Sequence, residues 1–123
     1  MTWIYSQTDG TLNHDGEQVG VGYSGHESGK NNAAMQEDIG VGPIPQGFWR
    51  IGQPYDSTSH GPHVMSLTPL AATETFGRSG FLIHGDAVSH PGDASLGCII
   101  MSRPVRDQIS ASLETDNLLE VTV

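Results

Sequence analysis

The sequence is poor in cysteine and in positive charge. Its 123 residues contain one cysteine, Cys98, and five Lys and Arg residues against fourteen Asp and Glu residues, so the formal net charge is −9. A single cysteine excludes an internal disulfide. So few cations exclude the basic surface that nucleic acids and anionic lipids require. No apolar run approaches the roughly 20 residues of a membrane span. We therefore expect no nucleic-acid partner and no membrane insertion, and we attribute the acidity mainly to solubility.

The first residues also lack a basic segment and a long apolar stretch, so no classical signal peptide is recognisable. Three explanations stay open at this point. The protein works in the cytoplasm, leaves the cell by a route that needs no such signal, or was cloned without its leader.

Glycine, by contrast, is abundant, with 16 residues. The length fits a single domain spanning residues 1–123, and the glycines favour a turn-rich, mainly β fold. Residues 33–38 are expected to form one helical turn, and residues 54–62 a turn-rich connection. Val105, Ile109 and Leu113 form one apolar stripe after Ser102 and Pro104, which predicts one helix in the C-terminal half. Strands are predicted at residues 2–6, 11–13, 18–24, 48–51, 64–67, 81–84 and 118–123.

The chemistry of this chain centres on a histidine at the end of an apolar run and a cysteine fourteen positions later. His84 precedes Gly85, and Cys98 ends the stretch Ser95-Leu96-Gly97-Cys98. A thiolate is a strong nucleophile that needs a neighbouring base, and a strand end would hold the imidazole rigidly. We predict Cys98 as nucleophile and His84 as base, with the amides of Gly97 and Cys98 facing a developing oxyanion. From these residues alone, a buried structural cysteine is an equally good interpretation.

Two rival interpretations use neighbouring residues. His84, Asp86, His90 and Asp93 offer four metal ligands within ten positions, and Cys98 would add a fifth. Their spacing matches no zinc motif, and acidic residues are common in glycine-rich loops, so we expect no metal and no cofactor. His90 is also the rival base, but no glycine follows it.

The sequence around the remaining histidines does not indicate a catalytic or metal-binding role. His60 and His63 flank a Gly-Pro turn and are expected to be exposed to solvent. His14 and His26 lie among polar residues and have no visible role.

The arrangement of His84 and Cys98 resembles the signature of the L,D-transpeptidase (YkuD-type) family, a histidine, a spacer of similar length and then Ser/Thr-His-Gly-Cys. It corresponds here to residues 81–85 followed by residues 95–99. Residues 43–51, Pro-Ile-Pro-Gln-Gly-Phe-Trp-Arg-Ile, resemble the upstream Pro-x-Gly-x-aromatic segment of that family. Three further segments are similar to the Tlde1-type effectors delivered by type VI secretion, namely residues 22–25, 30–32 and 66–69.

The resemblance implies a mainly β fold, an L,D-transpeptidase-like β-sandwich with one helix, acting on peptidoglycan stem tetrapeptides. Cys98 would attack the carbonyl between the L-centre of meso-diaminopimelate and the terminal D-alanine, with His84 as base. A backbone carbonyl at Gly85 would orient the imidazole, and Ser95 and Gly97 would shape the site. Water, a free D-amino acid or a second stem would then resolve the acyl-enzyme.

Two positions depart from the family pattern and predict an altered pocket. Leu96 stands where the family has histidine, and Ile100 stands where it has arginine. Arg78 and Arg103 are the candidate cations for a substrate carboxylate, with surface solubility as the other interpretation of each.

The resemblance also implies a biological setting. The protein would be an antibacterial toxin, secreted without a classical signal peptide, that acts in the periplasm of a target bacterium. An immunity protein would be its partner, with the acidic surface as one possible contact. The alternative is a non-catalytic cell-wall-binding module with an aromatic platform, although we expect core packing for these aromatic residues. They are Trp3, Tyr5, Tyr23, Phe48 and Trp49.

Overall fold

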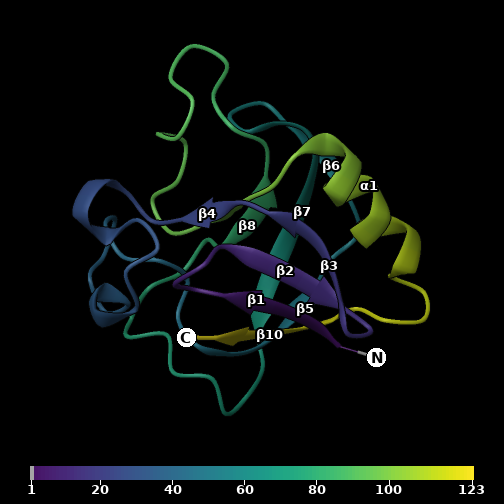
Figure 1. Ribbon diagram of the computed structural model, residues 1–123, viewed down its shortest axis with the longest axis horizontal. Helices are drawn as coiled ribbons and strands as arrows, with labels where there is room; N and C mark the ends of the chain where they lie inside the picture. The colour runs from purple at the N-terminus through teal and green to yellow at the C-terminus, as the bar shows by residue number, and fades with distance from the viewer. Residues whose placement is uncertain (1) are drawn as a thin grey trace.

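The computed structural model describes residues 2–123 and contains ten short strands and one α-helix. The helix, α1 (Arg103–Ser112), lies in the C-terminal half, so the prediction of a mainly β chain with one such helix is confirmed (Figure 1). Two 3₁₀ turns, Glu27–Gly29 and Ala33–Met35, lie in the segment between residues 24 and 47. The strands are β1 (Trp3–Ser6), β2 (Thr11–His14), β3 (Glu17–Val21), β4 (Tyr23–Ser24), β5 (Gly47–Ile51), β6 (Tyr55–Ser57), β7 (Gly61–Pro69), β8 (Leu82–His84), β9 (Ile99–Ile100) and β10 (Leu118–Thr122).

The strands form one continuous sheet that nearly closes on itself as a barrel (Figure 1). Their order is β3-β2-β1-β10-β5-β7-β8-β9-β4, with β6 attached to β7. The two layers expected of a β-sandwich are therefore opposite walls of one curled sheet. Its first and last strands, β3 and β4, are consecutive in the chain and separated by Gly22. A Cβ at Gly22 would lie 1.7 Å from the Ile100 carbonyl oxygen, so only glycine permits this close approach.

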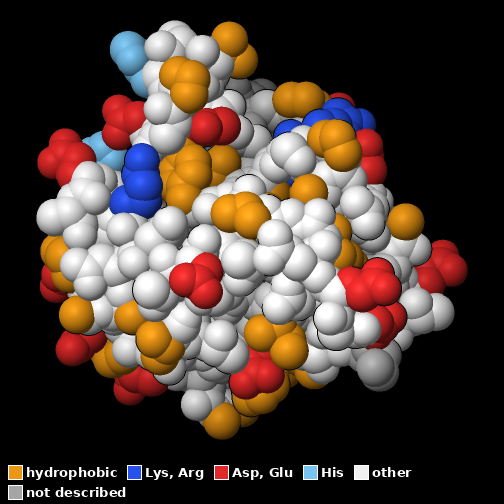
Figure 2. All heavy atoms as spheres, viewed as in Figure 1, with side chains coloured by type: hydrophobic (Ala, Val, Ile, Leu, Met, Phe, Trp, Pro, Cys, Tyr) orange, Lys and Arg blue, Asp and Glu red, His pale blue; other side chains and the backbone are white. Residues whose placement is uncertain are grey.

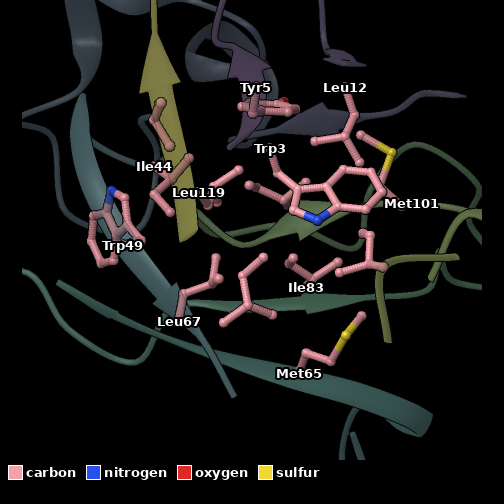
Figure 3. Packing of buried hydrophobic residues seen from close by; sticks show 14 of the residues in the cluster. Trp3, Tyr5, Leu12, Ile44, Trp49, Met65, Leu67, Ile83, Met101 and Leu119 are labelled. Carbon is pink, nitrogen blue, oxygen red and sulfur yellow. The ribbon is translucent and has the colours of Figure 1, made fainter. Parts of the chain in front are cut away.

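Inward-facing side chains of the curled sheet build the core (Figure 3). Trp3 and Tyr5 of β1, Trp49 of β5 and Leu119 of β10 are almost completely buried and belong to one hydrophobic cluster. Burying each such side chain contributes about 1.5–3 kcal/mol. The core interpretation is therefore correct for these three aromatic residues, whereas Phe48 is exposed.

Helix α1 packs its apolar stripe against the sheet. Val105 and Ile109 are buried within the helix, and Leu113 is buried directly after its end. Ser102 has the extended backbone of an N-cap, although its side chain makes no capping hydrogen bond. In the described part of the chain, no helix has the length and apolar character to cross a membrane.

Three elements differ from the sequence prediction, one of which is the two-residue strand β9, which the prediction does not include. The stretch 18–24 is broken at Gly22 into β3 and β4, because the sheet must bend where its ends meet. Residues 54–62 contain strand β6 and the first residues of β7. Strand β6 is short and polar, so its sequence shows no alternation of apolar residues that would predict a strand. It pairs with β7 through an irregular register.

Candidate active site

Cys98 and His84 line the same cavity, which has a volume of about 420 Å³. His84 comes from the end of β8, and Cys98 directly precedes β9, the strand that pairs in parallel with β8. The pairing of these two strands brings the predicted nucleophile and the predicted base to the same wall of the cavity. Other residues on the cavity surface include Ile39, His60, Arg78, Phe81, Leu96 and Gly97.

The His84 ring is held by the backbone of its neighbour. Nδ1 lies 2.8 Å from the Gly85 carbonyl oxygen. Because a carbonyl only accepts hydrogen bonds, Nδ1 must carry the proton in the neutral ring. Nε2 is therefore the nitrogen that can act as a base.

The surroundings of His84 keep the ring neutral. Burial lowers the pKa of His84 below its usual value, since only 3% of the residue is exposed. The Gly85 carbonyl opposes this effect, while the charges of His60 and Arg106 lower the pKa further. A neutral imidazole near neutral pH is the form that can accept a proton.

Cys98 is partly buried and rests as a thiol. Burial raises the pKa of its thiol, while a backbone hydrogen bond from Leu82 and the charge of Arg78 act in the opposite direction. The thiol donates a long hydrogen bond of 3.7 Å to the Gly80 carbonyl oxygen. A neutral thiol and a neutral imidazole lining one cavity suit a nucleophile that loses its proton as it attacks.

The turn before Cys98 is fixed by Ser95, which is fully buried. The Ser95 hydroxyl donates to the Cys98 carbonyl oxygen at 2.6 Å and accepts from the amides of Gly25 and Gly97 at 2.9 and 3.1 Å. The Gly97 amide is thus engaged within the turn, which leaves Cys98 as the remaining amide of the predicted oxyanion pair. Gly97 itself has φ +140°, a conformation that favours glycine.

Arg78 is buried beside the cysteine, with 7% of its surface exposed, so the surface interpretation of this residue is wrong. Its two terminal nitrogens donate to four backbone carbonyl groups, and the guanidinium lies 5.1 Å from the Phe81 ring centre. A role in binding a substrate carboxylate would compete with these bonds. The acceptors are Gln36 at 2.6 Å, Pro43 at 2.8 Å, Gly42 at 2.9 Å and Leu96 at 3.4 Å.

Arg106 is a second buried arginine, and sequence reasoning missed it. It donates to the carbonyl oxygens of Met101, Pro62 and His63 at 3.1, 2.8 and 3.0 Å. Nothing local distinguishes it from an exposed helix residue such as Arg103, which pairs with Asp107 four residues on.

The rival metal ligands are not gathered around the cavity. His90 is exposed at the loop surface. The Asp86 carboxylate accepts from the Tyr23 hydroxyl at 2.6 Å and from the Gly92 amide. Asp93 lies 3.0 Å from Nδ1 of His26. Within residues 2–123, the one trio of His and Asp groups close enough to hold an ion is elsewhere, at His14, Asp15 and Asp116.

The two positions that depart from the family pattern differ in location. Leu96 is 64% exposed at the edge of the cavity. Ile100 is buried in β9, paired with Tyr23 of β4. Leu96 therefore shapes the cavity directly, whereas Ile100 belongs to the sheet.

His60 is the second site residue that sequence reasoning missed. It is exposed, as expected, but its ring centre lies 4.7 Å from that of His84, and it lines the cavity. The same expectation is wrong for His63, which is half-buried and lies 2.9 Å from the Ser110 hydroxyl oxygen. His60 reaches its position from the turn between β6 and β7. The only sequence signal was a histidine before Gly61 in a turn, which carries no chemical information.

One family matches most of the chain. The Tlde1 domain family matches residues 18–123, a range that contains every residue of the cavity. This match confirms the sequence resemblance to the Tlde1 effectors. Neither a curated protein nor a solved structure shows significant similarity to the chain.

Proposed function

Because the chain belongs to the Tlde1 domain family, a family of type VI secretion effectors, we propose that it is a cysteine-dependent L,D-transpeptidase or L,D-carboxypeptidase. Its substrates are the tetrapeptide stems of peptidoglycan. The observation that carries this proposal is the shared cavity of Cys98 and His84, in which the Gly85 carbonyl leaves Nε2 of His84 free as the base.

The first half of the reaction forms an acyl-enzyme. Nε2 of His84 takes the thiol proton as Sγ of Cys98 attacks the carbonyl carbon between meso-diaminopimelate and D-alanine. The resulting oxyanion accepts a hydrogen bond from the Cys98 amide. As the carbon–nitrogen bond breaks, His84 returns its proton to the leaving amine, and D-alanine departs with an intact amino group.

The second half depends on which nucleophile reaches the thioester. Water gives a tripeptide stem, a free D-amino acid gives an exchanged stem, and the amine of another stem gives a cross-link. His84 again takes a proton from the incoming nucleophile, and Cys98 leaves as the thiol. Leu96, exposed at the cavity edge, stands where the L,D-transpeptidase signature has histidine, so the proposal does not require cross-linking activity.

The setting proposed for this reaction is the periplasm of a target bacterium, reached by type VI secretion. An immunity protein is the proposed partner. On the face seen in Figure 2, acidic side chains are widely scattered, while Lys and Arg gather at two places. With a net charge of −9, this surface suits a partner with a basic face.

The deciding experiment combines product analysis with intact mass. The protein is incubated with disaccharide-tetrapeptide, released D-alanine is measured, and the protein is examined for a covalent acyl adduct. We expect an adduct that is absent in Cys98→Ala, and release lost in His84→Ala. His90→Ala is the matched control and keeps most of the activity. Greater loss in His90→Ala than in His84→Ala would reverse the assignment of the base.

The same samples separate the alternatives. A cell-wall-binding module would release no D-alanine, and its cysteine would resist thiol-labelling reagents. A metal-dependent hydrolase would retain activity in Cys98→Ala, lose it with chelators, and contain stoichiometric zinc.

A further inference from the structure

The cavity contains a feature that the cysteine–histidine chemistry does not use. His60 lies on the cavity wall beside His84, with the two ring centres 4.7 Å apart and the rings inclined at 49°. It also borders the adjoining hollow of about 450 Å³, together with His84 and Asp86. His60 is therefore an exposed ionisable side chain next to the base, and it borders both hollows.

The D-alanine carboxylate of the substrate needs a positively charged partner close to His84. In the proposed reaction, the leaving nitrogen must lie against Nε2 of His84, since it receives its proton there. The D-alanine carboxylate carbon is two bonds from that nitrogen, which places it about 2.5 Å away. A ring whose centre is 4.7 Å from that of His84 is within reach of that carboxylate.

The other cations of the chain do not meet this demand. Of the five Lys and Arg side chains, only Arg78 lines the cavity among the described residues, and its terminal nitrogens already serve four carbonyl groups. Arg106 serves three carbonyl groups, and Arg103 pairs with Asp107. Lys30 lies over the Tyr23 ring, and Arg50 is exposed on β5.

The contacts of His60 leave one ring nitrogen available. Its Nδ1 lies 3.0 Å from the Ser59 hydroxyl oxygen. In the imidazolium form both nitrogens donate, so Nδ1 keeps this contact and Nε2 is free for a ligand. The titratable groups around this pair of rings are His84 itself, Asp86 in the loop after β8, which borders the same hollow, and Arg106 on α1, whose charge acts on His84. Asp86 does not compete for His60, because its carboxylate is engaged with Tyr23 and Gly92.

We propose that His60, as an imidazolium, forms the subsite for the terminal carboxylate of the D-amino acid that leaves the stem peptide. This inference rests on the proposed function and adds the source of its carboxy-terminal specificity. A charge-assisted hydrogen bond of this kind supplies roughly a tenfold preference for a free carboxylate over an amide.

The test compares two substrates that differ only at that end. At pH 6, a tetrapeptide stem with a free carboxylate is compared with the same stem ending in D-alaninamide. We expect wild type to favour the free acid about tenfold in kcat/KM, mainly through KM. His60→Gln should process both equally, and His60→Lys should restore the preference. His90→Gln is the control. Equal treatment of acid and amide by wild type, or an undiminished preference in His60→Gln, would overturn the subsite.

A binding measurement separates this inference from the reaction itself. Cys98→Ala is titrated with the same two peptides while the His60 ring proton signal is followed by NMR. A shift caused by the acid and not by the amide supports the subsite, whether or not wild type turns the peptide over. If wild type releases no D-alanine but the acid still shifts the His60 signal selectively, the proposed reaction is refuted and the proposed subsite is not. Identical responses to both peptides would refute the subsite even in an active enzyme.

Discussion

The two halves of the candidate site are supported in different ways. His84 ends a strand that pairs on both sides, antiparallel to β7 and parallel to β9. Cys98 follows an irregular loop whose shape depends on buried polar side chains, chiefly Ser95 and Arg78. Backbone pairing therefore positions the base, whereas side-chain hydrogen bonds position the nucleophile. Substitutions in the polar network should disturb the cysteine and leave the histidine in place.

The largest effect is expected from Arg78→Met. Removing the guanidinium leaves buried carbonyl groups without donors, including those of Gly42 and Pro43, which should cost about 3–5 kcal/mol of unfolding free energy. It also removes the charge that lowers the pKa of Cys98. Urea denaturation measures the loss. Arg50→Met, at an exposed position of β5, is the control and should change stability by less than about 0.5 kcal/mol. A loss below about 1 kcal/mol for Arg78→Met would mean that water replaces the guanidinium.

A pair of glycines tests the contrast directly. At Gly97, φ is +140° and a Cβ would lie 2.6 Å from the Arg78 guanidinium. Gly97→Ala should therefore cost about 3 kcal/mol and abolish thioester formation. At Gly85, a Cβ would lie 2.8 Å from Arg106, without the strained backbone, so Gly85→Ala should cost about 1 kcal/mol. Thermal denaturation and acyl-adduct mass compare the two variants. Equal losses of stability in the two variants would show that the loop before Cys98 tolerates an added methyl group as well as the end of β8 does.

The same contrast explains what the sequence reveals about this molecule. His84 and Cys98 could be predicted because their signals are local, an apolar run ending in His-Gly and a glycine before cysteine. The role of Arg78 could not, since its acceptors lie 18 to 42 positions away in the chain and follow only from the folded loops. Strand β6 could not be predicted from the sequence for a related reason, because its polar residues form a strand only through backbone pairing with β7.

Ser95→Ala should show a smaller effect on stability and a clear effect on the nucleophile. The change removes the acceptor of the Gly25 and Gly97 amides, which should cost about 2 kcal/mol. The turn before Cys98 would relax, so alkylation of the thiol by iodoacetamide should change several-fold in rate. The His84 ring should keep its Gly85 contact, visible as an unchanged Nδ1–H signal in NMR. A shifted His84 signal would show that the two halves are coupled through the loop.

The smallest effect concerns pH and the histidine half. Since His84 must be neutral to act, and burial holds its pKa below 6.5, kcat/KM should persist below pH 6.5 and fall only when the ring is protonated. With the stem that ends in D-alaninamide, which does not depend on the charge of His60, the alkaline limb should lie at high pH, because burial raises the pKa of the Cys98 thiol. Arg106→Met removes a charge that lowers the pKa of His84, so the acid limb of the kcat/KM profile should move to higher pH in this variant. Arg106→Lys retains the charge, so its acid limb should stay at the wild-type pH. Because burial is the larger influence on His84, this displacement must be small. An Arg106→Met profile identical to wild type would show that the charge of Arg106 does not set the pKa of His84, which leaves burial, the Gly85 carbonyl, His60 and Asp86. The contrast with Cys98, whose pKa responds to the charge of Arg78, would then be sharper.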